Sequence, residues 1–536
     1  GIFLAALAAI WRRLTMAWVV GILGALAAFA LLLGVPRIAH YATAIVAIGV
    51  GVQLATTARR APNGWRRISR RGAVTLAALT IVMGSGERLW RMVSERRAEG
   101  RLGPSASDAP NVLLIIFDTA RQASMSLYGY PRPTTPRLSE MAKESAVFEF
   151  ALSTAPWTLP SHGSLFTGRY PDRLTGDWLR PFAGGQRTLA RVLGEHGYVT
   201  GGFVNNLLYT SYESGLDQGF SRYVDYPVTF PVIVRHFTPG RTGFVTALLG
   251  SRSLYDLSRA LKTFNLDLAR EGADEPANAR RLTDAFLRWE RERGERPFFA
   301  FINYFDAHGL FRPTPSEEQL FPGGRRRDYY DAAIHRMDAE VGRITAALRA
   351  RGVLDETIVV VTSDHGEHLG GRGLEGHANS LYVSALRVPL VMRYPRRLAA
   401  QRVAQPVTLR DVPATILALA GIRDTGFPGN TLPSLLSSRV DSSASPLFAS
   451  LSQGINVPPS ARNAEGSLAT LFGERYQLIR GPRDREELYA YRRDSTNQQD
   501  LSNRLAQDPE VRALRELLLR LAGETGALPA RAAQNP

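Results

Sequence analysis

The sequence predicts an α/β fold with a doubly wound, mostly parallel sheet. Continuous apolar runs of strand length, typical of strands buried on both faces, recur along the chain. They lie at 111–117, 297–304, 357–362 and 388–393. Helical patterns such as 329–351 lie between them. Alternating strands and helices favour a sheet with helices on both faces, here preceded by an all-α transmembrane region and followed by a small α+β subdomain.

The region 1–86 is predicted to consist of transmembrane helices. The stretch 17–35 has 19 residues without a charge, which is enough for a helix to span a bilayer. Residues 41–58, rich in Gly and Ala, are a second candidate span, and 72–86 is a shorter third one. Several apolar segments in succession do not fit a single cleaved signal peptide.

The arginine distribution predicts the orientation of these spans. Arginines cluster at 12–13 and within 59–71, whereas the turn between the first two spans carries only Arg37. The positive-inside rule places both clusters in the cytoplasm and everything after a third span outside it. We therefore expect a multi-pass protein of the cell (inner) membrane that contacts membrane lipids and has an extracytoplasmic catalytic domain.

The chain is strongly basic, with 536 residues and a formal net charge of +16. Such a charge favours nucleic acid, an anionic membrane surface or an anionic substrate as a partner. No zinc-finger pattern or basic run with interleaved aromatic residues occurs, so nucleic acid is not expected. There are no cysteines, which excludes disulfides, thiolate metal sites and a Cys nucleophile. The sequence leaves the oligomeric state open.

Changes in composition predict the domain boundaries. Residues 87–110 are polar and Arg-rich and are expected to form a juxtamembrane linker. The main domain is predicted at 111–440, and within it 221–295 lacks buried-strand runs and is expected to be a helical insertion. The C-terminal subdomain is predicted at 441–525.

Two patterns characterise the C-terminal subdomain. A short β-like pair, SLATLFGERYQLIRG, covers 467–481. A helix is expected at 508–521, with Asp508-Pro509 at its start and Gly523 at its end. We expect this small unit to pack on the main sheet.

Three predicted strands end in side chains that can bind a metal ion. Asp118 follows the first run, Asp306 and His308 follow the second, and Asp364 and His365 follow the third. The carboxyl ends of parallel strands share one edge of a sheet, where ligands bind. Each Asp by itself could instead be an ordinary turn or cap residue. Together they favour a site for a divalent cation.

The segment APWTLPSHGSLFTG (155–168) places the hydroxyl of Thr158 where a loop is expected to become a helix. Pro160 suits a first helical turn, and a helix N-terminus attracts anions. Thr158 could simply be a helix cap. As a nucleophile it would require activation, for example by a metal ion. A Thr hydroxyl beside Asp and His ligands favours cleavage of a phosphate or sulfate ester.

Several segments occur in an order that is specific to one family. They include NVLLIIFDTARQASMSLYGYPRPTTPRL, APWTLPSHGSLFTGRYP, LARVLGEHGYVTGGFVNN, VTSDHGEHLGG and GHANSLYVSALRVPLVM. From Asn111 to about Leu521 the chain resembles the sulfatase-type branch of the alkaline phosphatase superfamily, in its membrane-anchored bacterial form. The resemblance implies that family's fold, an anionic ester substrate, and one or two divalent ions (Zn, Mn, Mg or Ca).

The resemblance also implies roles for the residues that match the family motifs. Asp118, Asp364 and His365 would be metal ligands, and Thr158 would be a nucleophile that also touches the metal.

Four further residues match functional positions of the family. Asp306, His308 and His377 correspond to positions that hold a second metal, bind the anion or protonate the leaving group; we expect Asp306 to be a metal ligand and both histidines to be catalytic. Arg121 stands where relatives often keep an arginine near the nucleophile.

The chain departs from the arylsulfatase pattern at several positions. Thr158 replaces the Cys or Ser that is oxidised to formylglycine, and His162 replaces the Arg of the same motif. Thr119 replaces the second Asp of an Asp-Asp pair, and 202–205 replaces a Gly-Lys-Trp-His run. The chain is therefore closer to the Thr-nucleophile branch of phosphodiesterases and phosphotransferases, such as lipoteichoic-acid synthases and phosphoethanolamine transferases.

These patterns lead to one main hypothesis and two alternatives. We expect a membrane-anchored, metal-dependent hydrolase or transferase that cleaves a phosphate or sulfate ester of an envelope or lipid-linked substrate. One alternative is a catalytically inactive membrane binding module, favoured by Thr119 and Ala123 where relatives often have Asp. The other is a Ser-His-Asp esterase that uses Ser161 or Ser164, although neither lies in a Gly-x-Ser-x-Gly motif.

Overall fold

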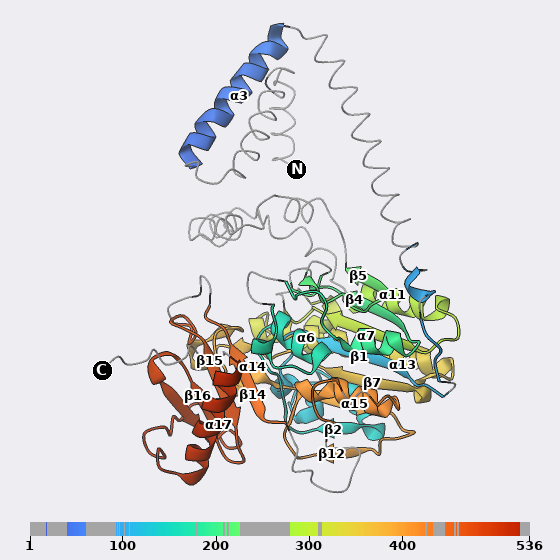
Figure 1. The fold of residues 1–536 in the computed structure, drawn as a ribbon, viewed down its shortest axis with the longest axis vertical. Helices are drawn as coiled ribbons and strands as arrows, with labels where there is room; N and C mark the ends of the chain where they lie inside the picture. Colours follow the sequence, from blue (N-terminus) through green and yellow to red (C-terminus); the bar gives the residue numbers. More distant parts are fainter. Residues whose placement is uncertain are drawn as a thin grey trace. The chain divides into compact units, whose positions relative to one another are not determined.

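Figure 1 shows the fold of the protein in a computed structural model. The residues that it describes are 18, 40–60, 93, 95, 97–100, 102–106, 108–176, 181–206, 209–211, 214–225, 279–308, 313–423, 426–432, 445–454, 457 and 460–525. The chain divides into two compact units. One comprises Gly1–Ser94 and Pro227–Glu271, and the other Glu95–Tyr226 and Gly272–Pro536.

Helix α3 (His40–Arg60) belongs to the first unit and covers the second expected span. Arg59 and Arg60 lie in its last turn. Among the residues that the structure describes, no helix combines the length and the apolar character needed to cross a membrane. The expected spans at 17–35 (except Trp18) and 72–86 lie outside the described residues.

A mixed sheet forms the centre of the second unit. In the described part of the chain it has eight strands in the order β12-β2-β11-β7-β1-β6-β4-β5. These are β12 (Gln401–Val403), β2 (Ala146–Phe148), β11 (Leu390–Arg393), β7 (Thr357–Thr362), β1 (Asn111–Phe117), β6 (Phe298–Tyr304), β4 (Val199–Val204) and β5 (Arg222–Asp225). The consecutive strands β7, β1, β6, β4 and β5 run parallel to one another, which confirms the mostly parallel sheet.

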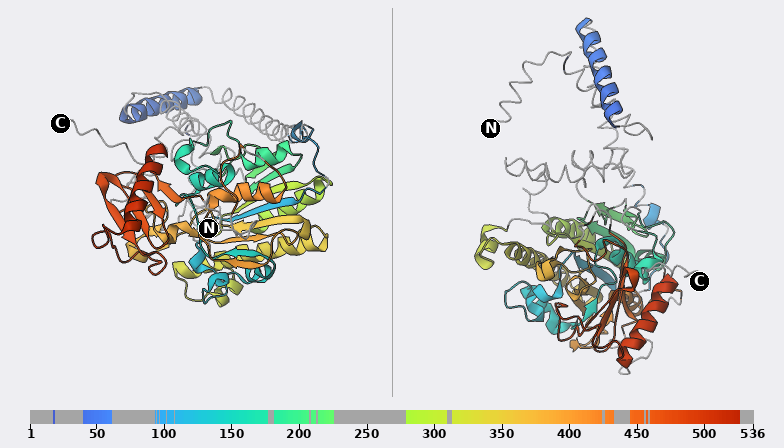
Figure 2. Two further views of the ribbon diagram at one scale, coloured as in Figure 1. Left: turned by 60° about the horizontal axis from the view of Figure 1, so that its bottom comes forward. Right: turned by 90° about the vertical axis from the view of Figure 1, so that its left-hand side faces the viewer.

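Helices cover both faces of this sheet, as Figures 1 and 2 show. Alternate side chains of β1 enter two different cores: Leu114 packs with one and Ile115 with the other. The first core includes α6 (Thr158–Thr167), α7 (Leu189–Glu195) and α15 (Val412–Leu419). The second includes α5 (Pro136–Met141), α11 (Ala279–Glu292) and α13 (Arg326–Ala350). Burial of both faces explains why β1 is apolar at every position before Asp118 except its first.

One predicted strand is interrupted. The apolar run 388–393 forms β10 (Arg387–Val388) and β11, separated by Pro389, which has no N–H for a sheet hydrogen bond. Strand β11 runs antiparallel to β7, and β10 joins a second small sheet with β3 (Ala151–Leu152) and β13 (Val407–Thr408).

The range 221–295, which we expected to be a helical insertion, contributes to the main sheet at both ends. Strand β5 pairs with β4, and α11 packs against β6 and β4. Residues 226–278 lie outside the described residues. Strand β5 was missed because its sequence, RYVD, is half exposed and has no apolar run.

The C-terminal subdomain is a four-stranded antiparallel sheet with one long helix. Its strands are β14 (Leu447–Leu451), β15 (Leu468–Phe472), β16 (Gln477–Arg480) and β17 (Glu486–Tyr489). Helix α17 (Pro509–Thr525) packs on this sheet, as the red elements of Figure 2 show, so the predicted β pair and helix are confirmed. Gly523 does not end the helix as predicted, because α17 continues to Thr525.

Candidate active site

The carboxyl ends of the central parallel strands bring the predicted ligands together. Asp118 follows β1, and Asp364 and His365 follow β7, the strand beside it. All three side chains are fully buried, and each offers one ligand atom within 4.8 Å of the other two. Adjacent strand ends therefore produce a cluster from residues far apart in the sequence.

Each carboxylate of this cluster has one oxygen that is already engaged and one that is not. Oδ2 of Asp118 accepts hydrogen bonds from Nδ2 of Asn206 at 3.0 Å and of Asn303 at 3.3 Å. Oδ1 of Asp364 accepts the backbone N–H groups of Thr119 at 3.1 Å and His365 at 2.9 Å. The remaining oxygens, Oδ1 of Asp118 and Oδ2 of Asp364, are buried without a hydrogen-bond partner.

His365 completes the cluster with a nitrogen that can bind a metal ion. Its Nδ1 lies 2.9 Å from the carbonyl oxygen of Gly366, which can only accept, so Nδ1 carries the proton. Nε2 then keeps its lone pair and lies 3.4 Å from Oδ2 of Asp364. Two orphaned carboxylate oxygens and one imidazole nitrogen fit a divalent cation, because buried polar atoms are otherwise nearly always paired.

The electrostatics of the cluster support the same interpretation. Burial raises the pKa of Asp118 well above its ordinary value, and the neighbouring Asp364 raises it further. Burial raises the pKa of Asp364 to about 7, and burial together with His377 lowers the pKa of His365. Two buried carboxyl groups that repel each other would both be stabilised in ionised form by a dication.

Thr158 lies at the first position of α6, next to this cluster. Its hydroxyl Oγ1 is 3.4 Å from Nε2 of His365 and 3.4 Å from Nδ2 of Asn206. Trp157 occupies the N-cap position, and its side chain makes no capping bond. Thr158 is therefore not the helix cap, and its hydroxyl faces the metal-ligand cluster at the positive end of the helix dipole.

His162 supports the nucleophile segment one turn further along α6. Its Nδ1 lies 2.9 Å from the carbonyl oxygen of Thr158 and donates to it, and its Nε2 accepts from Nδ2 of Asn303 at 3.2 Å. Burial lowers the pKa of His162 to about 4, so the ring is neutral near pH 7. The position where the arylsulfatase pattern has an arginine thus carries no charge.

Thr119, which stands where relatives have a second Asp, acts through its backbone. It adopts a left-handed conformation with φ of 63°. This conformation is unfavourable for a β-branched residue and directs its N–H toward Asp364. The main chain here orients a predicted metal ligand.

His377 lies next to the cluster, and His308 lies next to His377. The ring centre of His377 is 4.5 Å from that of His365 and 4.9 Å from that of His308. Burial, together with His377, lowers the pKa of His308 to about 3. The structure therefore brings both predicted catalytic histidines to the candidate site.

A carboxylate and an arginine fix the orientation of His377. Nδ1 of His377 lies 2.8 Å from Oε2 of Glu367, and Oε1 of Glu367 accepts a bond from Nη2 of Arg326 at 3.0 Å. The other terminal nitrogen of Arg326 donates to Glu375 at 2.8 Å. With Nδ1 directed at Glu367, Nε2 is the nitrogen left to meet a substrate.

Two predicted site residues make their hydrogen bonds outside the cluster. Oδ2 of Asp306 accepts the N–H of Ala279 at the start of α11 (3.1 Å), and Oδ1 faces Arg336 at 3.7 Å. Asp306 is thus placed to cap a helix and does not join the three clustered ligands. Nε of Arg121 bonds to Ser124 at 2.8 Å, and no bond to Thr158 occurs within the described residues.

The serine hydroxyls are not arranged as esterase nucleophiles. Oγ of Ser161 donates to the carbonyl oxygen of Asp364 at 2.6 Å and lies 3.0 Å from Oγ of Ser153. Oγ of Ser164 is buried without a partner in the described structure. Neither bonds to a histidine, so the geometry of a Ser-His-Asp site is not present at these serines.

Four residues that shape the site were not predicted from the sequence: Asn206, Asn303, Glu367 and Arg326. Asn303 lies near the end of an apolar strand, and Asn206 follows a Gly-rich one. Their positions near strand ends were the one feature from which a role in the site could have been predicted. Glu367 follows the Asp364-His365 pair in sequence, but nothing local indicates that it contacts His377.

Residues 110–422 match the family model described as Sulfatase. This match covers more than half of the 536 residues and includes every member of the site. The chain belongs to the sulfatase family.

Curated members of the sulfatase family show the same relationship. Mouse steryl-sulfatase is 29% identical over 397 residues, which cover 60% of this chain and 63% of that protein. Human N-acetylgalactosamine-6-sulfatase is 26% identical over 370 residues, covering 62% of this chain and 67% of the relative. The chain thus spans less than two thirds of the length of the mouse enzyme.

Solved structures share the sulfatase fold. The phosphonate monoester hydrolase of Agrobacterium radiobacter superposes with a TM-score of 0.61 at 19% identity, covering 78% of this chain and 96% of that one. A protein in complex with its substrate D-glucosamine-2-N,6-O-disulfate gives a TM-score of 0.62 at 15% identity, covering 78% and 98%. At this identity the likeness shows the fold, which confirms the expected architecture of the main domain.

Proposed function

We propose that this sulfatase-family chain is a membrane-anchored, metal-dependent hydrolase or transferase that cleaves a phosphate or sulfate ester through Thr158. The observation that carries the proposal is the position of Oγ1 of Thr158, 3.4 Å from Nε2 of His365 and beside the orphaned oxygens of Asp118 and Asp364. A divalent cation held by these three ligands would lower the pKa of the hydroxyl and withdraw charge from the ester oxygens.

The residues of the chain supply the remaining steps. Oγ1 of Thr158 releases its proton to solvent and attacks phosphorus or sulfur; the bond from Oγ1 to that atom forms, and the bond to the leaving oxygen breaks. Nε2 of His377, whose ring carries a proton on both nitrogens at this stage and is held by Glu367, protonates the leaving oxygen. Water or an acceptor alcohol then attacks phosphorus or sulfur and gives its proton to Nε2 of His377. The bond to Oγ1 breaks, and Oγ1 takes up a proton from solvent to restore the threonine hydroxyl. Nδ2 of Asn206 donates to both Oδ2 of Asp118 and Oγ1 of Thr158 and so fixes the two side chains relative to each other.

Two features favour a phosphate ester over a sulfate ester. Thr158 cannot be converted to formylglycine, because its β-carbon carries a methyl group. His162 is neutral where the arylsulfatase pattern has a cation. We therefore propose a phosphoester as the preferred substrate.

The proposed location and substrate class follow from the N-terminal sequence. The uncharged stretch 17–35 and the arginine clusters that flank the expected spans support a multi-pass inner-membrane protein with an extracytoplasmic catalytic domain. We propose an envelope or lipid-linked ester as the substrate, because the expected anchor would keep the domain near the membrane surface.

The test measures bound metal and turnover on the full chain purified in detergent. Bis(4-nitrophenyl) phosphate, 4-nitrophenyl phosphate and 4-nitrophenyl sulfate are compared for the wild type, Thr158→Ala and, as a matched control, Thr158→Ser. We expect stoichiometric divalent metal, phosphoester turnover, at least a thousandfold loss in Thr158→Ala and retained turnover in Thr158→Ser. Activity of Thr158→Ala near the wild-type level would refute the mechanism.

The same measurement decides the alternative of a catalytically inactive binding module. A module that keeps the fold without chemistry does not need a stoichiometric metal ion. Absence of both metal and turnover in the folded wild type would therefore favour that alternative.

A further inference from the structure

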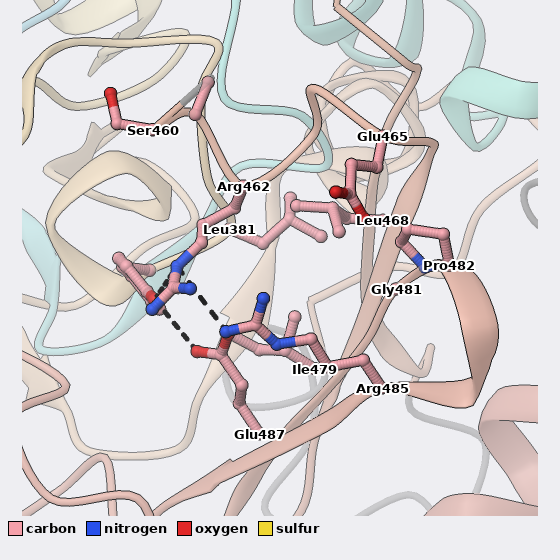
Figure 3. Close-up of a pocket in the computed structure, with 12 residues that line it drawn as sticks. Leu381, Ser460, Arg462, Glu465, Leu468, Ile479, Gly481, Pro482, Arg485 and Glu487 are labelled. Atoms are coloured by element: carbon pink, nitrogen blue, oxygen red, sulfur yellow. Dashed lines mark hydrogen bonds and ion pairs between the residues drawn. The ribbon is translucent and has the colours of Figure 1, made fainter. Parts of the chain in front are cut away.

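A hollow of about 240 Å³ lies where the main domain meets the C-terminal subdomain (Figure 3). Its apolar floor is formed by Leu381, Leu468 and Ile479, and its polar wall by Arg462, Arg485 and Glu487. A second hollow of about 420 Å³ shares Tyr382 and Arg462 with it and extends to Arg372. Nothing in the proposed mechanism uses these residues.

The buried carboxylate of this pocket is satisfied mainly by neutral groups. Oε2 of Glu487 accepts hydrogen bonds from the hydroxyls of Tyr382 at 2.9 Å and Tyr489 at 2.6 Å. Its contacts to arginines are longer, 3.7 Å to Arg462 and 3.5 Å to Arg485. Both arginines thus approach Glu487 without forming a hydrogen bond to it.

The arginines therefore keep donors for another partner. Nε of Arg462 donates to the Tyr382 hydroxyl at 2.8 Å, and its terminal nitrogens make no hydrogen bond within the described part of the chain. The side chain of Arg485 is 62% exposed, and its contact there is the 3.5 Å ion pair. Figure 3 shows both side chains directed into the same space as Glu487. Glu465, also on the lining, pairs instead with Arg483 at 3.5 Å.

Arg372 adds a third positive charge, and its backbone is strained. It has φ of 55°, in the left-handed region, between the β8 (His368–Leu369) and β9 (Glu375–Gly376) strands. Its guanidinium lies 4.8 Å from the ring centre of Tyr382. This conformation is unfavourable for a non-glycine residue and indicates a position set by its surroundings.

The pocket wall is continuous with the catalytic loop. The N–H of Arg462 donates to the carbonyl oxygen of Asn379 at 2.8 Å, and Nδ2 of Asn463 donates to that of Ala378 at 3.2 Å. Ala378 directly follows His377, and its own N–H bonds to Pro156 at 2.9 Å. A ligand that contacts Arg462 therefore acts on a wall that is hydrogen-bonded to both the His377 loop and the Thr158 segment.

We propose that this pocket binds an anionic group, a carboxylate, phosphate or sulfate, attached to a small apolar or cyclic carbon skeleton. Arg462 and Arg485, with donors available, lie beside a carboxylate that tyrosines already satisfy, and Arg372 lines the adjoining hollow, where it donates to the carbonyl oxygen of Asn497. Three arginines against two glutamates, Glu465 and Glu487, leave the lining of the two hollows net positive. The apolar floor takes the carbon part of the ligand. Binding of the anionic group in this pocket does not depend on the proposed function. An effect of that binding on turnover rests on the proposed function.

Binding is tested by calorimetry on the metal-loaded full chain, with phenylphosphonate as a non-hydrolysable probe. The test variant is Arg485→Gln, and the matched control is Arg493→Gln, which removes the same charge from an exposed residue outside both linings. We expect two binding sites in the wild type and in Arg493→Gln. In Arg485→Gln the affinity of one site should fall about tenfold, which corresponds to the loss of one charge-assisted hydrogen bond.

A second measurement identifies the source of the anionic group. If it belongs to the substrate, Arg485→Gln lowers kcat/KM for glucose 1,6-bisphosphate and leaves that for glucose 1-phosphate unchanged. If it is a separate ligand, phenylphosphonate changes kcat for glucose 1-phosphate in the wild type and not in Arg485→Gln. Either result supports the pocket.

Identical stoichiometry and affinity for phenylphosphonate in the wild type, Arg485→Gln and Arg462→Gln would overturn the proposal. Melting temperatures equal to that of the wild type show that each variant is folded. Because calorimetry needs no turnover, a protein that binds phenylphosphonate in the pocket but hydrolyses nothing would refute the proposed function alone.

Discussion

Nδ1 of His377 lies 2.8 Å from Oε2 of Glu367, while the other oxygen of that carboxylate is held by Arg326. Both oxygens of Glu367 are therefore engaged, and its side chain is only 7% exposed. This arrangement fixes the tautomer and the ring orientation of the histidine expected to protonate the leaving group.

Glu367→Gln should therefore impair turnover in a way that depends on the leaving group. The amide keeps the size of the side chain but loses the charge that orients His377. We expect kcat to fall about 10- to 100-fold, with a larger loss for phenyl phosphate than for 4-nitrophenyl phosphate, whose leaving group needs less protonation. Glu375→Gln, the exposed partner of the same Arg326, is the control and should change little. Equal losses for both esters would contradict this role.

Removing the metal should make stability depend on pH. Burial raises the pKa of Asp364 to about 7, above its ordinary 3.8 in the unfolded chain. A carboxyl group with a raised pKa in the folded state stabilises that state below the unfolded pKa, and this contribution is lost as pH rises toward 7. We expect the free energy of unfolding of chelator-treated protein to fall by about 1–4 kcal/mol over this window. Denaturant titrations with and without metal measure it.

The control for this prediction is Asp118→Asn. It removes one of the two repelling carboxylates, so the metal-free variant should be more stable than the metal-free wild type near neutral pH. Unfolding free energies that do not change with pH in the metal-free wild type would show that the two carboxylates are stabilised in another way.

His162→Arg restores the arginine of the arylsulfatase motif and should destabilise the fold. The His162 ring is fully buried, 5.7 Å from the ring centre of Phe301, and bonded on both nitrogens. A guanidinium there would lose both hydrogen bonds and overpack a fully buried position. Although Oδ2 of Asp364 lies 3.6 Å from Nδ1 of His162, we expect a cost of about 1–3 kcal/mol. His196→Arg, on the exposed end of α7, should stay within about 0.5 kcal/mol. A His162→Arg variant that unfolds at the wild-type temperature would refute this account.

Gly202→Ala tests the packing of β4. A Cβ at Gly202 would lie 2.4 Å from ring atoms of Tyr223, closer than real contacts allow. We expect a loss of about 1–3 kcal/mol in thermal or denaturant unfolding. Gly184→Ala, where nothing lies within 4 Å of the added carbon, serves as the control. Comparable stability of the two variants would mean that Tyr223 moves aside at little cost.

The central strands could be predicted from sequence because β1, β6 and β7 are buried on both faces. The Gly-rich strand β4 could not, since Gly201 and Gly202 make room for aromatic rings that come from other parts of the chain. Such steric requirements become visible only when the partners are known.

The candidate site divides in the same way. Asp118, Asp364 and His365 follow predicted strands, so their convergence could be anticipated from the topology. Asp306 also follows a predicted strand, but its carboxylate accepts the N–H of Ala279 at the N-terminus of α11. The sequence before α11 has no strand-like pattern, so this contact could not be anticipated. Glu367 was missed because its contact with His377 depends on the hairpin of β8 and β9, which brings residue 377 back beside residue 367.

The place of β1 in the sheet has a consequence for the order of folding. Val112 pairs with Phe299 on one side and with Ile358 on the other. During synthesis this fully buried, almost entirely apolar strand therefore leaves the ribosome long before either neighbour exists. Such long-range pairing predicts slow folding and a period in which an aggregation-prone segment needs protection by a chaperone until residue 362 has been made.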